Sequence, residues 1–146
     1  IVQRHSQSER SYTLVNGSLI EFRSGHHPET LVSVGLNGVL IDEAARLRRD
    51  AWEENLRATL ADRRGWAVFV TTPRGVANWV YDMHATYPEV YGDDFAEFVF
   101  KTVDNTAVPC LAGGTSSHFF LARMVLARSS YRRASAVRPA RLRICA

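Results

Sequence analysis

The chain has 146 residues, of which 46% are hydrophobic and 23% charged, and its formal net charge is +3. These values are typical of one soluble globular domain with its own core. No uninterrupted apolar run approaches the length of a membrane span, so we do not expect an integral membrane protein. The two cysteines, Cys110 and Cys145, lie far apart, which disfavours a zinc ribbon or a disulfide framework and fits a reducing cytosol. The first residue is Ile1, from which we expect the chain to begin inside a longer reading frame.

Two short apolar segments near the amino terminus, 11–15 and 18–23, flank the dipeptide Asn16-Gly17. Asn-Gly favours the two positive φ angles of a type I′ turn, so this pattern predicts a β-hairpin. The polar loop at 24–30 that follows carries two adjacent histidines, His26 and His27. No further ligand residue stands at metal-binding spacing, so an exposed loop is favoured over a metal site.

Residues 38–45 read Gly-Val-Leu-Ile-Asp-Glu-Ala-Ala, an apolar run that ends in two carboxylates. Such a run predicts a strand buried on both faces, and parallel strands of this kind end at the sheet edge where α/β folds bind ligands. Two acids at that edge need a compensating positive charge, and hydrated Mg²⁺ is the natural partner. The alternative is that Asp42 and Glu43 start a helix, where acids favour the helix dipole.

A helix is predicted after this strand, from Asp50 to the Arg63-Arg64-Gly65 segment. Asp50 and Glu53 have the spacing of a capping box, and the cations and glycine mark the carboxyl end. An apolar stripe at four-residue spacing gives the helix one buried face. Its members are Trp52, Leu56 and Leu60.

A second buried strand is predicted at 66–70, and it ends in Thr71-Thr72-Pro73-Arg74-Gly75. A helix at 76–87, stopped before Pro88, and a strand at 95–103 follow. Strands that alternate with helices predict an α/β fold with a parallel sheet and right-handed crossovers.

The character of the sequence changes near Cys110. Residues 109–118 are Gly- and Ser-rich and predict a linker. Residues 119–126 fit a short basic amphipathic helix, and 119–146 form an arginine-rich tail without acids that we expect to be poorly ordered. A frame error or an eroded gene end would produce such a tail, as would a nucleic-acid-binding arm. We favour the degenerate tail because no aromatic residues interleave the final arginines.

Taken together, the segments 16–18, 31–37, 39–45 and 70–75 and the Trp52 helix resemble one family. It is the large terminase subunit of tailed bacteriophages and prophages, and the resemblance covers residues 11–108 of this chain, in the family's amino-terminal packaging ATPase. The resemblance implies a partial P-loop NTPase core of the ASCE type, with a mainly parallel sheet, flanking helices and an N-terminal β-hairpin. Residues 1–108 would form this partial ATPase domain.

The resemblance also implies roles for individual residues. Asp42 would be the Mg²⁺ ligand and Glu43 the catalytic carboxylate of ATP hydrolysis. The threonines and proline at 71–73, namely Thr71, Thr72 and Pro73, match the coupling motif that senses the γ-phosphate. Asp104-Asn105 resembles the pair that follows the last core strand of the family. Arg74 is a candidate contact to phosphate or DNA, with a solvated loop arginine as the alternative.

The cofactors implied by the resemblance are Mg²⁺ and ATP in the full-length protein, and we expect this fragment to bind them weakly or not at all. The implied partners are double-stranded DNA, the small terminase subunit and the portal protein, in the cytoplasm of the bacterial host. Other functions stay open on the residues alone. They are a helicase-type ATPase fragment and a non-enzymatic DNA-binding or decayed prophage protein.

The sequence departs from the family in two respects. It has no Gly-x-x-x-x-Gly-Lys-Ser/Thr segment, and no acid follows Asp104 where the family's nuclease would carry several. We therefore expect negligible ATP hydrolysis by the chain alone. We also expect an unpaired sheet edge beside the strand at 38–41, with marginal stability or self-association through that edge.

Overall fold

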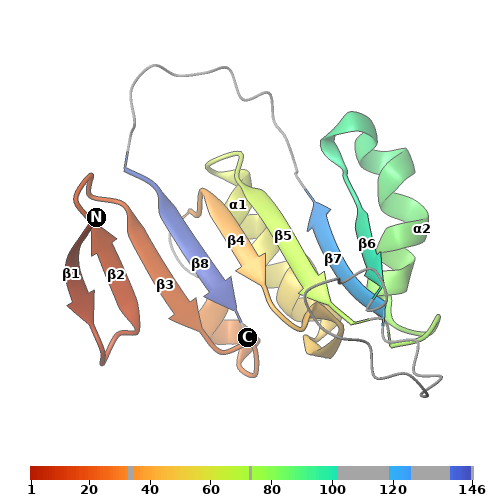
Figure 1. The fold of residues 1–146 in the computed structure, drawn as a ribbon, viewed down its shortest axis with the longest axis horizontal. Helices are drawn as coiled ribbons and strands as arrows, with labels where there is room; N and C mark the ends of the chain where they lie inside the picture. The colour runs from red at the N-terminus through yellow and green to blue at the C-terminus, as the bar shows by residue number, and fades with distance from the viewer. Residues whose placement is uncertain (33–34, 73, 102–118, 126–138, 146) are drawn as a thin grey trace.

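The structure, a computed structural model, describes residues 1–32, 35–72, 74–101, 119–125 and 139–145 (Figure 1). These residues form one eight-stranded sheet in the order β1-β2-β3-β8-β4-β5-β7-β6. The strands are β1 (Val2–Ser6), β2 (Ser11–Leu14), β3 (Leu19–Arg23), β4 (Gly38–Ile41), β5 (Trp66–Thr71), β6 (Phe98–Lys101), β7 (Phe119–Val125) and β8 (Arg141–Cys145).

The centre of the sheet is parallel and its two sides are antiparallel. β3, β8, β4 and β5 run in the same direction, with Ile41 of β4 level with both Cys145 of β8 and Phe69 of β5. The pairs β1–β2, β2–β3, β5–β7 and β7–β6 are antiparallel. The α/β class predicted from the sequence is confirmed, whereas the mainly parallel sheet is wrong, because the sheet is mixed.

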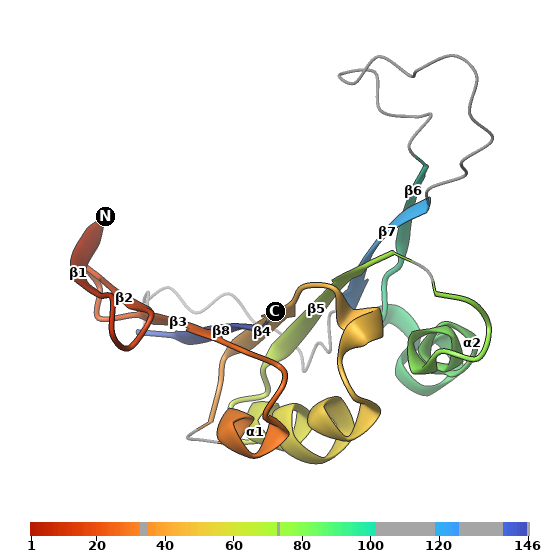
Figure 2. The same cartoon turned by 90° about the horizontal axis from the view of Figure 1, so that it is seen from below.

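The helices gather on one face of the sheet (Figure 2). A π-helical segment, Ala51–Leu56, runs directly into α1 (Arg57–Ala61), and α2 spans Trp79–Tyr91. None of the helices among the described residues has the length and apolarity needed to cross a bilayer. Three 3₁₀ turns complete the helical elements, at Pro28–Leu31, Ala44–Arg46 and Gly92–Asp94.

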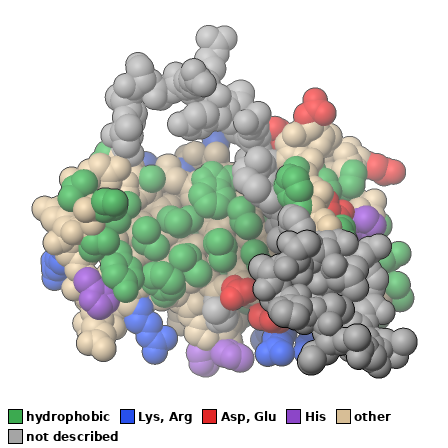
Figure 3. All heavy atoms as spheres, viewed as in Figure 1, with side chains coloured by type: hydrophobic (Ala, Val, Ile, Leu, Met, Phe, Trp, Pro, Cys, Tyr) green, Lys and Arg blue, Asp and Glu red, His purple; other side chains and the backbone are tan. Residues whose placement is uncertain are grey.

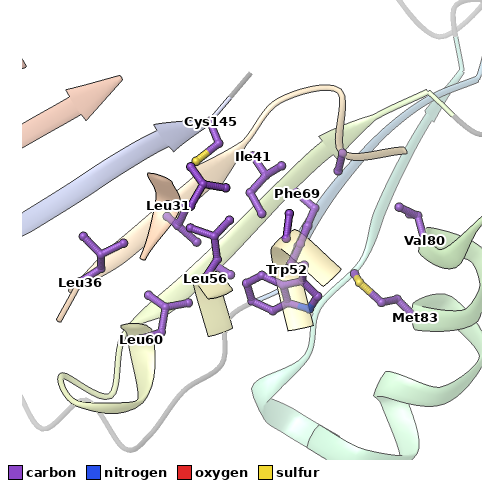
Figure 4. Close-up of a cluster of buried hydrophobic side chains, with 14 of the residues drawn as sticks. Leu31, Leu36, Ile41, Trp52, Leu56, Leu60, Phe69, Val80, Met83 and Cys145 are labelled. Carbon is purple, nitrogen blue, oxygen red and sulfur yellow. The ribbon is translucent and has the colours of Figure 1, made fainter. Parts of the chain in front are cut away.

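The hydrophobic core lies between this helical layer and the sheet (Figure 4). The predicted stripe of Trp52, Leu56 and Leu60 is buried, which confirms the face assigned to that helix. Phe69 of β5 meets the ring of Trp52 edge-on at a centroid distance of 4.7 Å and that of Trp79 at 6.1 Å. Aromatic pairs of this geometry add to the free energy gained by burial.

The opposite face of the sheet carries apolar side chains that no described helix covers (Figure 3). Phe22 and Trp66 are 38% and 37% exposed there. Trp66 lies across Gly38, where an added Cβ would come within 2.4 Å of the indole ring. The absence of a side chain at Gly38 therefore leaves room for the Trp66 ring.

Two local predictions are wrong in detail: the type of the turn between β2 and β3, and the end of α2. The hairpin between β2 and β3 forms, but of its two turn residues only Gly17 has a positive φ, so the turn is not type I′. Asn16 instead accepts a hydrogen bond from the Ser18 amide at 3.0 Å.

α2 does not stop before Pro88 but continues to Tyr91 and ends at Gly92, whose φ is +52°. Pro88 has no N–H and cannot donate a helical hydrogen bond to the carbonyl of His84. Both residues are exposed, so water can bond to that carbonyl.

The carboxyl-terminal part differs most from expectation. Residues 119–125 form strand β7, not a helix, and 141–145 form β8 inside the sheet, where we expected a poorly ordered tail. β8 lies between β3 and β4, so β4 is paired on both sides and has no open edge. Among the described strands, the sheet edges are β1 and β6. The predicted linker, residues 109–118, lies outside the described residues.

Candidate functional site

The two predicted carboxylates follow β4 directly. Asp42 and Glu43 are both exposed, and they stand where the carboxyl ends of the parallel strands β8, β4 and β5 meet. A cavity of about 280 Å³ opens beside them on the β8 side. It is lined by Gly25, His26, Ile41, Asp42, Glu43, Arg46, Leu47, Arg48 and Cys145.

The backbone turns sharply at the second acid. Glu43 has φ +50° and ψ +41°, a left-handed conformation that costs a non-glycine residue about 1–3 kcal/mol. Its amide donates to Oδ1 of Asp42 at 2.9 Å, and its carboxylate lies 3.4 Å from Nε of Arg46. The helix that follows is only the 3₁₀ turn Ala44–Arg46, and neither acid caps it through its side chain. The pair therefore does not serve to start a long helix.

The end of β5 contacts the loop that carries the acids, which we call the acidic loop (residues 42–47). Thr71 is buried, and its hydroxyl accepts a hydrogen bond from the Ala45 amide at 2.9 Å and donates to the carbonyl of Thr72 at 3.3 Å. Thr71 thus comes close to the acidic pair, as expected of neighbouring strand ends. Neither threonine lines the cavity.

Of the remaining predicted site residues, the structure describes only Arg74, and Arg74 does not line the cavity. Arg74 is exposed beyond the end of β5. Pro73, Asp104 and Asn105 lie outside the described residues. Of the adjacent histidines, His26 lines the cavity, whereas His27 lies 3.3 Å from Glu29 on the surface.

Two residues that the sequence did not mark as functional also contact the acidic loop. Asn78 donates from Nδ2 to the carbonyl of Ala45 at 2.9 Å, and Trp79 donates from Nε1 to the carbonyl of Leu47 at 2.8 Å. An asparagine before a helix is a sequence signal for an N-cap, and Asn78 does accept from the Val80 amide. No sequence signal indicates the bond to Ala45.

The donor set of the site suits a hard, hydrated cation. Two carboxylates with nearby solvent match Mg²⁺, which keeps several waters and takes one or two protein carboxylates. In the part of the chain that the structure describes, no group of three or more metal-ligating side chains forms. The two acids thus fit Mg²⁺ held mainly by water.

The β8 side of the site rests on a buried ion network. Arg143 is 2% exposed, donates to the carbonyl of Leu31, and lies 3.3 Å from Glu21. Burial raises the pKa of Glu21, but the hydrogen bond from Arg23 and the charges of Arg143 and Arg141 outweigh it and leave this pKa below its ordinary value.

Cys145 ends β8 at the base of the cavity. Its carbonyl accepts from the Asp42 amide at 2.8 Å, which extends the pairing of β8 with β4 to the first acid. Burial raises the pKa of the Cys145 thiol to about 11, although the charge of Arg143 lowers it. A thiol with this pKa is almost entirely protonated at neutral pH and is a poor nucleophile.

Comparisons with known proteins point to one family. A family model described as "Terminase large subunit, T4likevirus-type, N-terminal" matches residues 2–117. The terminase large subunits of Thermus phage G20c and Thermus virus P23-45 are each 41% identical over 64 residues, which is 42% of this chain and 13% of theirs. That of Escherichia phage T5 is 32% identical over 85 residues, 57% of this chain and 19% of its own. The chain thus spans less than a fifth of the length of these curated relatives. No solved structure matches the chain significantly.

Proposed function

Because the chain belongs to the terminase large subunit family, we propose that its acidic loop supplies the carboxylate half of an ATP-hydrolysing site that drives DNA packaging. The observation that carries this proposal is the position of Asp42 and Glu43 at the carboxyl edge of the parallel strands, beside a cavity. Ligands of open α/β sheets bind at this edge.

The two acids would have different tasks. Asp42 would hold Mg²⁺, which, when bound, neutralises charge on phosphate oxygens. Its Oδ1 atom accepts a hydrogen bond from the Glu43 amide, which limits the rotation of the carboxylate. Glu43 would orient the attacking water and accept its proton, because its side chain is 50% exposed and can contact solvent.

The nucleotide itself needs more than these residues. The chain contains no Gly-x-x-x-x-Gly-Lys-Ser/Thr segment, whose backbone amides and lysine hold phosphates. We therefore propose that the chain alone binds Mg²⁺ but hydrolyses ATP negligibly. Double-stranded DNA, the small terminase subunit, the portal protein and the host cytoplasm belong to the same proposal and rest on family membership.

The test is a chimera in which residues 38–75 of this chain replace the corresponding segment of the Thermus phage G20c terminase large subunit. The chimera should hydrolyse ATP, and Glu43→Gln should reduce the rate at least about a hundredfold, the usual contribution of a general base. The matched control is Glu54→Gln in the same chimera, because Glu54 is an exposed acid on the helical segment. A folded chimera that hydrolyses ATP equally well with Glu43→Gln would contradict the proposal.

A DNA-binding arm at the carboxyl terminus is not supported by the described arginines. Arg143 is buried in the sheet and engaged with Glu21, so it cannot contact DNA in this fold. Nε of Arg141 also lies 3.8 Å from Oε2 of Glu21, so the two side chains form an ion pair. We therefore propose no second function for this segment.

A further inference from the structure

The acidic loop, residues 42–47, lacks regular structure that would fix its shape. The loop contains one three-residue 3₁₀ turn, Ala44–Arg46. Glu43, which precedes this turn, has the left-handed backbone described above. Both acids are exposed. A strained conformation in an exposed loop persists only where surrounding contacts determine it.

Three of those contacts come from the segment between the end of β5 and the first turn of α2. Thr71 accepts from the Ala45 amide, Asn78 donates to the Ala45 carbonyl, and Trp79 donates to the Leu47 carbonyl. Both backbone groups of Ala45 are thus bonded to side chains more than 25 residues away. The three bonds hold the loop immediately after Glu43.

Asn78 uses both ends of its amide. Oδ1 accepts from the Val80 amide at 3.0 Å and caps α2, while Nδ2 holds the loop. α2 is itself fixed on the core by Val80 and Met83, which point toward the sheet and are 5% and 3% exposed (Figure 4). The cap therefore orients the amide group, and the packed helix supplies a rigid base for the second hydrogen bond.

We propose that Asn78 and Trp79 are positioning residues, which hold the acidic loop through the carbonyls of Ala45 and Leu47 and so fix the direction of Glu43. A movement of the first turn of α2 relative to the sheet would then move the acidic loop with it. The effect on metal binding rests on the function proposed above, whereas the effect on the loop does not. The simpler account is that Asn78 only caps α2 and Trp79 only packs in the core.

The experiment separates these accounts with two substitutions. Asn78→Asp keeps the side-chain oxygen that caps α2, since Asp is as good an N-cap as Asn, but it removes the donor to Ala45. Trp79→Phe keeps an aromatic ring against Phe69 and removes the donor to Leu47. Asn55→Asp is the matched control, because Asn55 also donates from Nδ2 to a backbone carbonyl, that of Asp50, within its own helical segment.

Two measurements are made on each full chain: hydrogen exchange of individual backbone amides by NMR, and Mn²⁺ affinity as a probe for Mg²⁺. With Asn78→Asp, exchange of the amides of residues 45–47 should rise roughly tenfold, the effect of about one lost hydrogen bond. The amides of β4 should change little. Mn²⁺ should bind roughly tenfold more weakly, as is usual when a group supporting a metal ligand is lost. Trp79→Phe should act in the same direction, and Asn55→Asp should do neither.

Unchanged exchange at residues 45–47 in both Asn78→Asp and Trp79→Phe would overturn the proposal. So would faster exchange spread evenly over the chain, because that indicates general destabilisation. If exchange rises only in the acidic loop while no form of the chain binds Mn²⁺, the positioning role stands and the proposed function fails. The two ideas are therefore separated by one set of samples.

Discussion

The two neighbours of β4 hold the acidic strand in different ways. On the β5 side, side chains reach across to the acidic loop, from Thr71 at the strand end and from Asn78 and Trp79 beyond it. On the β8 side, backbone pairing runs along the strand and ends with the hydrogen bond from the Asp42 amide to the Cys145 carbonyl. Beyond that bond the structure opens into the cavity.

This difference matches two requirements of the catalytic role that we propose for Glu43. The β5 side fixes the shape of the loop and therefore the direction of Glu43. The β8 side completes the sheet and leaves space for a ligand beside Asp42. Functional side chains need a rigid support on one side and an accessible volume on the other.

The largest expected effect is on the chemical reactivity of Cys145, which tests whether β8 occupies the sheet. In a Cys110→Ser chain, Cys145 is the only thiol. It is fully buried, so it should react with a thiol reagent at least about a thousandfold more slowly than in urea, given typical unfolding free energies. Comparable rates in buffer and in urea would show that β8 does not pair with β4.

Phe69→Ala should cause the largest loss of stability on the β5 side. The ring is fully buried between Trp52 and Trp79, and truncation of such a residue costs about 3–5 kcal/mol. Val68→Ala is the matched control on the uncovered face of the same strand and should cost about 1 kcal/mol or less. Equal losses in chemical unfolding would contradict the assignment of the two faces.

On the β8 side, Arg143→Met should destabilise the chain by about 2–3 kcal/mol, because it leaves the buried Glu21 with fewer positive partners. The loss stays below that of an isolated buried pair because Arg23 and Arg141 still face this carboxylate. Adding Glu21→Gln to the variant should recover part of the loss in the same urea titration. A double variant less stable than Arg143→Met would refute the pairing.

A smaller effect is expected for Thr71→Val on the β5 side. The change keeps the shape of the side chain but leaves the Ala45 amide without its acceptor, at a cost of about 1–2 kcal/mol. Thr59→Val is the control, since the buried Thr59 hydroxyl only donates to the Leu56 carbonyl within its own helix. Thermal unfolding should therefore show the larger shift for Thr71→Val, and the reverse order would count against the role of this hydroxyl.

The smallest expected effect is a pH dependence that arises from Glu21. Its pKa is lowered in the folded chain, so the carboxylate contributes stability above the ordinary glutamate pKa of about 4.3. That contribution is lost as the pH falls through the folded pKa. The stability difference between the wild-type chain and Glu21→Gln should therefore shrink as the pH falls below about 4. A difference that grows on acidification would contradict the direction of the shift.

Much of the fold around the site could be predicted from the sequence. The hydrophobic run at 38–41, the Trp52 stripe and the Asn16-Gly17 turn each indicate a local element, and all three elements form. β8 could not be predicted in this way, because Arg143 breaks the apolar pattern of a buried strand. Its charge is accommodated by long-range partners, among them Glu21, which stands 122 residues earlier in the chain, and the carbonyl of Leu31.

The candidate site shows the same limit. Asp42 and Glu43 are marked by the abrupt end of an apolar run, and Thr71 by its place at the end of the next strand. Asn78 and Trp79 have ordinary local explanations as a cap and a core aromatic. Their contacts with Ala45 and Leu47 depend on how α2 packs on the sheet, which local sequence patterns do not report.

The most direct test of the account is a Mn²⁺ titration of the chain followed by electron paramagnetic resonance, with Mg²⁺ as competitor. The account predicts one Mn²⁺ per chain that Mg²⁺ displaces, and binding at least about tenfold weaker in Asp42→Asn. Asp93→Asn is the control, because Asp93 is also an exposed acid directly beside a second acid, Asp94, at a 3₁₀ turn. Equal Mn²⁺ affinity in the wild-type chain and Asp42→Asn, or no binding at all, would contradict the metal-binding role of the acidic loop.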